Sequence, residues 1–223
     1  LRPKFVVVSG DLTHANPSQE FYLAQLLEFR KLMARVSETI PVIYTCGNHD
    51  VSDHPTVDDL ESYTKHFGAD YFGFWCGGLR GLVLNSCLFK NAPALIAQAQ
   101  QQLEWFEQEI EQAKLCAQQV VVITHHPWFL THADEEDDPT WTIPRDIRLK
   151  MLKLMHHRKV QVVLAGHYHQ NAGGLAFPNA AAQAAEEQKA VKDEGDEDDE
   201  GALSGSDEDR QSFSSDNLAD KKT

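Results

Sequence analysis

The stretch PVIYTCGNHD, residues 41–50, holds an apolar run that ends abruptly in four residues of a different kind. The run is typical of a buried β-strand, and Gly47 permits a tight exit from it. Asn48 then offers a side-chain oxygen, His49 an imidazole and Asp50 a carboxylate. A turn that carries only surface groups is the simpler alternative, but this combination at a strand end favours a functional site.

Three more motifs repeat the pattern. Each follows an apolar run that reads as a strand, and they are Gly10-Asp11, His125-His126-Pro127 and Gly166-His167-Tyr168-His169. The carboxyl ends of parallel strands share one edge of a sheet, so we expect these side chains to converge there. Carboxylate, amide and imidazole groups together suit a divalent metal such as Mn, Fe or Zn. The sequence therefore predicts a metal-centred hydrolytic site built from all four motifs.

Taken singly, these motifs are weaker evidence than they are together. Asp11 alone fits a turn or a helix cap better than a metal ligand. His125 and His126 face opposite ways in an extended segment, so we expect only one of them at the site and interpret His126 as structural. His167 and His169, at i and i+2, point to one side of an extended segment, which suits ligands of two neighbouring metals.

The rest of the pattern alternates strands with helices. Strands are predicted at residues 5–9, 42–46, 70–76, 79–86, 120–124 and 160–165, and helices at 18–38, 56–67, 97–116 and 144–157. Thr56 and Asp59 form a capping-box pattern, Gly77-Gly78 signals a hairpin, and Pro144 suits the first residue of a helix. This alternation predicts an α/β fold.

The composition separates the end of the chain from its body. The net charge is −14, and residues 186–223 hold 14 acidic and 5 basic residues, which leaves −5 for residues 1–185. The acidity argues against nucleic-acid binding, which needs a basic surface. No signal peptide or membrane span is recognisable, and the four cysteines form no CxxC pair. We therefore expect a cytoplasmic, monomeric protein that binds neither nucleic acid nor membrane.

The ordered motifs GD, GNHD, a histidine after a strand, and GHxH resemble those of the calcineurin-like metallophosphoesterases. The stretches GDLTHA (10–15), YFGFW (71–75) and GHYHQNAGG (166–174) are similar to those of a serine/threonine phosphatase of this family. The resemblance covers residues 1–174. It implies a four-layer αββα sandwich that holds two divalent metal ions.

The resemblance also implies the metal ligands. Asp11 would bridge both metals. Asn48, His125 and His167 would complete one site, and His169 would serve the other. The family's first metal motif is missing here, which leaves the second metal with Asp11 and His169.

Two further roles follow from the resemblance. His49 would be the proton donor or the clamp on the transition state, and Asp50 would hold its imidazole. The implied reaction is in-line attack of metal-bound hydroxide on a phosphoric ester, with a phosphorylated substrate such as a phosphoprotein. The alternative is a catalytically impaired fragment that acts as a metal-binding or protein-interaction module.

The expected organisation is a metallophosphoesterase domain at residues 1–178, truncated at both ends and lacking its first metal motif. An acidic tail at residues 179–223 follows, and its composition predicts disorder because it cannot bury enough apolar surface to offset its ordering entropy.

Overall fold

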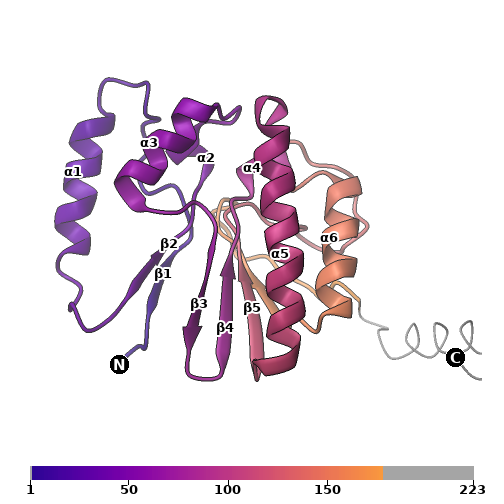
Figure 1. Ribbon diagram of the computed structural model, residues 1–223. Coiled ribbons are helices and arrows are strands. Elements are labelled where there is room, and N and C mark those ends of the chain that lie inside the picture. The colour runs from indigo at the N-terminus through magenta and orange to yellow at the C-terminus, as the bar shows by residue number, and fades with distance from the viewer. Residues whose placement is uncertain (1, 178–223) are drawn as a thin grey trace, which may run out of the picture. The chain divides into compact units, whose positions relative to one another are not determined.

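Six apolar strands form two separate sheets in the computed structural model, which describes residues 2–177 (Figure 1). The first sheet is the parallel pair β1 (Val6–Val8) and β2 (Val42–Tyr44). The second has the order β3-β4-β5-β6, with β3 (Phe72–Cys76), β4 (Leu79–Val83), β5 (Gln119–Ile123) and β6 (Val162–Leu164). The tail predicted at residues 179–223 lies outside the described residues.

The strand directions follow from the connections. The hairpin predicted at Gly77-Gly78 joins β3 to β4, which are antiparallel. The pairs β4–β5 and β5–β6 are parallel, and a helix lies between the two strands of each pair in the chain. All three strands of this parallel part therefore deliver their following residues to the same end of the sheet.

The helices occupy the stretches where helical periodicity is predicted, together with three short elements. They are α1 (Tyr22–Met33), α2 (Asn48–Val51), α3 (Val57–Phe67), α4 (Cys87–Lys90), the 3-10 helix η1 (Pro93–Leu95), α5 (Ile96–Cys116) and α6 (Arg145–His157).

Two helix starts differ from the prediction, and one agrees with it. The predicted cap Ser18 instead lies in a turn in which the N–H of Gln19 donates to the carbonyl of Asn16, so α1 begins later. Pro144 is the residue before α6 rather than its first residue. The capping box of α3 is confirmed, because Thr56 and Asp59 each accept a hydrogen bond from the other's backbone N–H.

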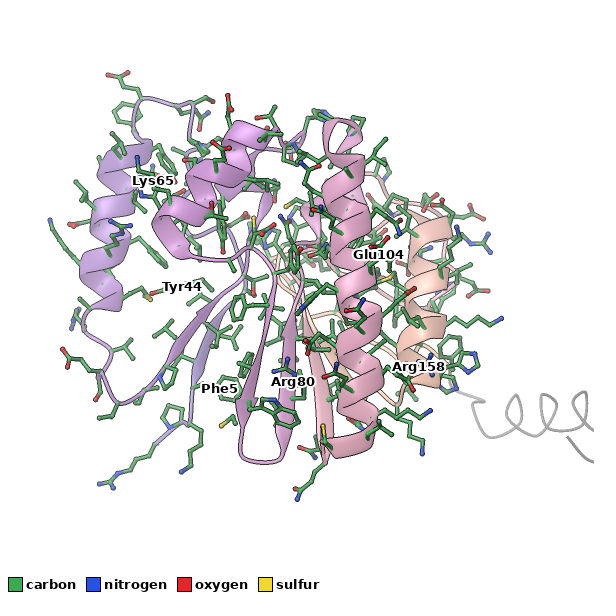
Figure 2. The ribbon with its side chains drawn as sticks, viewed as in Figure 1. Phe5, Tyr44, Lys65, Arg80, Glu104 and Arg158 are labelled. Carbon is green, nitrogen blue, oxygen red and sulfur yellow. The ribbon has the colours of Figure 1, made fainter. Side chains whose placement is uncertain are left out.

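The two sheets pack against each other through apolar side chains. Ile43 of β2 lies in one buried cluster with Val83 of β4 and Ile123 of β5. Phe5 adds an edge-to-face contact with Phe74, with ring centroids 5.2 Å apart (Figure 2). This interface forms the two inner layers of the fold.

Helices cover the outer face of each sheet. Tyr44 of β2 packs on Phe29 of α1 and Phe67 of α3, with ring centroids 5.6 and 6.0 Å away (Figure 2). On the second sheet, α5 buries Phe106 and Ile110 completely and contacts β4 and β5. The predicted four-layer αββα sandwich is therefore confirmed.

Charged pairs join the elements around α5. Arg80 of β4 pairs with Glu109 of α5, and Arg158, which follows α6, pairs with Glu111 of α5 at 2.6 Å (Figure 2).

Within residues 2–177, no helix combines the length and the apolar character that a bilayer span requires.

Candidate metal centre

The four motifs meet where the ends of the two sheets come together. Asp11 and Asn48 follow β1 and β2, whereas His125 and His167 follow β5 and β6 of the other sheet. The prediction that all four share the edge of one sheet is therefore wrong. They converge because the two sheets stack with these strand ends on the same side.

Two glycines allow the close approach of these segments. A Cβ atom at Gly10 would collide with the ring of His125, and one at Gly47 would collide with the backbone nitrogen of Asp11. Gly10 also has a φ of +91°, which side chains disfavour. Only glycine at both positions lets Asp11, Asn48 and His125 come together.

The Nε2 atom of His125 is the centre of the arrangement. It lies 3.1 Å from Oδ1 of Asn48, 3.2 Å from Nδ1 of His167 and 3.3 Å from Oδ1 of Asp11. His125 is almost completely buried. One member of each motif thus contributes to a single cluster of oxygen and nitrogen atoms.

Hydrogen bonds on the outer side fix the two imidazoles. Nδ1 of His125 lies 2.7 Å from the carbonyl oxygen of Ser9, and Nε2 of His167 lies 3.0 Å from the carbonyl oxygen of Thr140. A carbonyl only accepts, so each of these nitrogens carries a proton. When both rings are neutral, they present a lone pair on Nε2 of His125 and on Nδ1 of His167 towards the cluster.

The side-chain oxygens of Asn48 and Asp11 are also oriented by hydrogen bonds outside the cluster. The amide nitrogen of Asn48 donates to Asp53 at 2.9 Å, which turns the amide oxygen towards His125. Asp11 accepts a hydrogen bond from the backbone N–H of His49 at 3.0 Å. Burial raises the pKa of Asp11, but its contacts with His125 and His49 outweigh burial and lower it. Asp11 is therefore ionised at neutral pH.

These groups fit a divalent cation. Asp11, Asn48, His125 and His167 direct two oxygen and two nitrogen atoms at one another, and these atoms repel one another unless a proton on His125 or a cation lies among them. Burial, above all, lowers the pKa of His167 and favours its neutral, metal-binding form. Mixed oxygen and imidazole donors suit Mn, Fe or Zn.

His126 lies in the cluster, contrary to the prediction that only one histidine of the pair reaches it. Ring nitrogens of His125, His126 and His167 lie within 4.8 Å of one another, and the ring centroids of His126 and His167 are 4.4 Å apart. The alternation argument fails because the chain bends at 125–126 rather than continuing as a strand. His126 is nevertheless held like a structural residue, since its Nδ1 lies 3.0 Å from the hydroxyl of Ser86.

The GHxH segment is not extended either. His167 and His169 have φ values of +63° and +57°, so the segment is a series of bends. His169 is exposed and lines the same pocket as His167. The extended backbone expected for this segment is therefore wrong, although both imidazoles line one pocket.

Asp50 does not orient the His49 imidazole. It is fully buried, and its two oxygens accept hydrogen bonds from the backbone N–H groups of Gly47 at 2.8 Å and Leu12 at 2.9 Å. Nδ1 of His49 instead contacts the carbonyl oxygen of His14, whose ring stacks on it. The predicted support fails because α2 turns Asp50 into the core, where it ties the first two motifs together.

Burial is the main influence on the Asp50 carboxyl group. It raises the pKa of Asp50 to about 7, and the charge of Asp11 adds to the rise, whereas the N–H bonds from Gly47 and Leu12 oppose it.

Asp11, Asn48 and His167 line a pocket of about 650 Å³ that the sequence did not outline. His49 and His169 also line it, together with Lys90, Asp137, Asp138 and Trp141, none of which the motifs singled out. Trp141 contacts the rings of His167 and Tyr168, with centroids 5.4 and 5.3 Å away. The loop before α6 carries these acidic residues and Trp141, and no local pattern predicts that it covers the site.

Comparison with known proteins places this geometry in a family. Residues 1–171 match the family model described as calcineurin-like phosphoesterase. The chain is 36% identical over 174 residues to the serine/threonine-protein phosphatase CPPED1 of Homo sapiens, covering 78% of this chain and 55% of that protein. The Danio rerio protein of the same name is also 36% identical, covering 78% of this chain and 56% of its own length. The chain thus spans about half the length of these relatives.

More distant phosphatases share the fold. Purple acid phosphatase 23 of Arabidopsis thaliana is 21% identical over 198 residues, covering 75% of this chain and 41% of that protein. The structure of purple acid phosphatase PPD1 from yellow lupin (Lupinus luteus) superimposes with a TM-score of 0.53 at 14% identity, covering 74% of this chain and 30% of that one. With a family match over residues 1–171, the chain belongs to the calcineurin-like phosphoesterase family.

Proposed function

We propose that the pocket hydrolyses phosphoric esters in a metal-dependent reaction. The observation that supports this most is the environment of His125, whose Nε2 atom faces Asp11, Asn48 and His167 at 3.1–3.3 Å. Oxygen and nitrogen atoms gathered around one imidazole nitrogen at the mouth of a pocket suit a cation that binds an anionic substrate.

Asp11, Asn48, His125 and His167 would hold the first cation. A divalent cation supplies Lewis acidity, which neutralises charge on phosphoryl oxygens and lowers the pKa of water. The hydrogen bonds that His125, His167 and Asn48 donate to Ser9, Thr140 and Asp53 would keep the ligand atoms oriented before a cation binds. Asp11 and His169 are the candidates for a second cation.

His49 is the candidate proton donor or transition-state clamp. Its backbone N–H is held by Asp11, and its Nδ1 is held by the carbonyl of His14. Nε2 is therefore the ring atom left to exchange a proton with, or donate to, a substrate in the pocket. Asp50 acts on this step only indirectly, by fixing the turn that carries His49.

A phosphorylated protein is the proposed natural substrate. The relatives at 36% identity are named serine/threonine-protein phosphatases, and the family match covers the segment that carries the pocket. A cytoplasmic, monomeric protein stays the prediction for its location and state, which cell fractionation and light scattering test.

The test measures hydrolysis of p-nitrophenyl phosphate and of a phosphoserine peptide with Mn²⁺, Fe²⁺ or Zn²⁺. We expect metal-dependent turnover in the parent and a loss of about 10²–10⁴-fold in His49→Ala at equal metal content. Asn48→Ala should lose metal as well as turnover. His157→Ala, on the exposed end of α6, is the matched control. Equal turnover in parent and His49→Ala would remove His49 from the reaction.

A metal-binding or interaction module without turnover is the second candidate. It is favoured by the position of His169, which is exposed and lies outside the three-histidine group of the described residues. Calorimetric titration separates the two candidates. Two tight sites together with turnover support the hydrolase, whereas one site or none without turnover supports the module.

A further inference from the structure

The pocket contains one lysine that the candidate reaction does not yet use. Lys90 ends α4, and it is the sole lysine or arginine among the described residues that line the pocket. Its neighbours there include the carboxylates Asp53, Asp137 and Asp138. A single cationic side chain among these carboxylates calls for an explanation, and its contacts are the starting point.

The ammonium group of Lys90 has neutral partners and a hydrogen to spare. Nζ donates to the carbonyl oxygens of Thr142 at 2.6 Å and of Asp138 at 3.4 Å. Among the described residues, Lys90 takes part in no ion pair. An ammonium group has three N–H donors, so these two carbonyl contacts leave one donor of this pocket-lining side chain unused.

The charge of Lys90 is only partly compensated by its surroundings. Burial lowers the pKa of Lys90 to about 8, against the opposing pull of Asp138, Asp53 and Asp137. The side chain is therefore still mostly charged at pH 7 while it has lost part of its water. The same charge reaches the metal centre, since it adds to burial and to the neighbouring imidazoles in lowering the pKa of His126 and His167.

His126 supplies a second donor of a different kind. The hydroxyl oxygen of Ser86 accepts hydrogen bonds from the backbone N–H groups of His125 at 3.2 Å and His126 at 2.9 Å. With both lone pairs used, that hydroxyl donates its hydrogen to Nδ1 of His126 at 3.0 Å. The proton of the neutral ring then resides on Nε2. His126 is buried and lines the pocket, so it presents a fixed, uncharged N–H donor.

We propose that Lys90 and His126, which line the pocket beside the candidate ligands Asp11, Asn48 and His167, bind the phosphoryl oxygens of the substrate. The ammonium group supplies the charge and the imidazole supplies an oriented neutral donor, a pairing that suits a tetrahedral anion. This inference rests on the proposed phosphoesterase function. A lysine that served only to tie α4 to residues 138–142 would make the two carbonyl contacts but would not change the affinity for an anion.

The experiment measures binding of inorganic phosphate to the Mn²⁺-loaded chain by calorimetry, without any turnover. We expect Lys90→Met to bind phosphate at least about 10-fold more weakly than the parent at equal metal content and thermal midpoint, and Lys90→Arg to restore most of the affinity. Lys153→Met, on the exposed face of α6, should match the parent. Equal affinity in parent and Lys90→Met, or a parent that binds no phosphate, would overturn the role of Lys90.

His126→Phe tests the second donor, because it keeps the ring and removes both nitrogens. We expect unchanged metal content with phosphate affinity about 10-fold lower. A variant that loses its metal would show His126 to be a ligand and would overturn its role as a donor, as would unchanged phosphate affinity. Phosphate binding needs no turnover, so a parent that binds phosphate without hydrolysis counts against the proposed function alone.

Discussion

The Nε2 atom of His125 lies 3.1 Å from the Oδ1 atom of Asn48, although 77 residues separate them in the chain. Asn48 follows β2 of the two-stranded sheet and His125 follows β5 of the four-stranded sheet. Their contact therefore depends on how the two sheets stack. Any change that shifts one sheet end against the other should act first on this pair.

Asp53→Ala should weaken metal binding without unfolding the chain. Asp53 is exposed and accepts the amide N–H of Asn48 at 2.9 Å, which keeps the amide oxygen directed at His125. Loss of such outer support typically lowers metal affinity by about 10–100-fold. Titration with Mn²⁺ measures the change, with Asp58→Ala at an exposed position of α3 as the control. Equal affinity in both variants would show that the Asn48 amide needs no orientation.

Gly47→Ala should damage both stability and metal binding. The new Cβ would collide with the backbone nitrogen of Asp11, so we expect a loss of about 3 kcal/mol in the free energy of unfolding and a large loss of metal affinity. Gly77→Ala is the contrasting change. Gly77 has a φ of +61°, but a Cβ added there would meet open space. The substitution should therefore lower the free energy of unfolding by about 1 kcal/mol and leave metal affinity intact. Urea denaturation measures both, and similar effects from the two changes would refute the steric explanation.

Asp50→Asn should destabilise the fold by about 2 kcal/mol. Each carboxylate oxygen of Asp50 accepts a backbone N–H, one from Gly47 and one from Leu12. An amide offers one acceptor and turns its NH₂ group against the second N–H, which leaves a buried donor unsatisfied. Denaturation should show this loss, whereas Asp58→Asn should stay within about 0.5 kcal/mol of the parent. If both variants were equally stable, Asp50 would not brace the two motifs.

Glu135→Gln should lower stability at neutral pH more than in acid. Glu135 accepts hydrogen bonds from the backbone N–H groups of Leu130, Thr131 and His132 and from the Thr131 hydroxyl. Burial raises the pKa of Glu135, but these bonds outweigh it and lower the pKa from 4.5 to about 2. The folded state therefore favours the ionised form. The resulting stability is present above pH 4.5 and is lost as the pH falls towards 2.

Because Glu135 is partly exposed, we expect the substitution to cost only about 1 kcal/mol at pH 7. Thermal midpoints of parent and Glu135→Gln should differ at pH 7 and approach each other near pH 2. A difference that is the same at both pH values would mean that the charge of Glu135 plays no part.

The elements of the fold were predictable because their signals are local. The capping box of Thr56 and Asp59 and the hairpin at Gly77-Gly78 involve residues a few positions apart, and both form as expected. The start of α1 was not predictable in the same way, because the turn at Asn16 and Gln19 competes with a cap at Ser18. A cap signal decides where a helix begins only where no neighbouring turn competes for the same backbone groups.

The candidate site was likewise only partly predictable from local sequence signals. The motifs identified Asp11, Asn48, His125 and His167, because a chemically distinctive residue at the end of an apolar run is visible in the chain itself. The orientation of the neighbouring side chains was not visible. Asp50 faces the core and His126 joins the cluster, since bends and short helices replace the extended exits that simple alternation assumes.

The sequence by itself determined the α/β alternation, the family motifs and the four residues that surround a shared centre. Only the tertiary structure decided that two stacked sheets bring them together, that Ser9, Thr140 and Asp53 orient His125, His167 and Asn48, and that Lys90 shares the pocket. The physical reason is the distance along the chain between the residues that interact. Strand and helix signals arise between residues close in the chain, whereas a pocket is made by the packing of segments whose proximity no local pattern encodes.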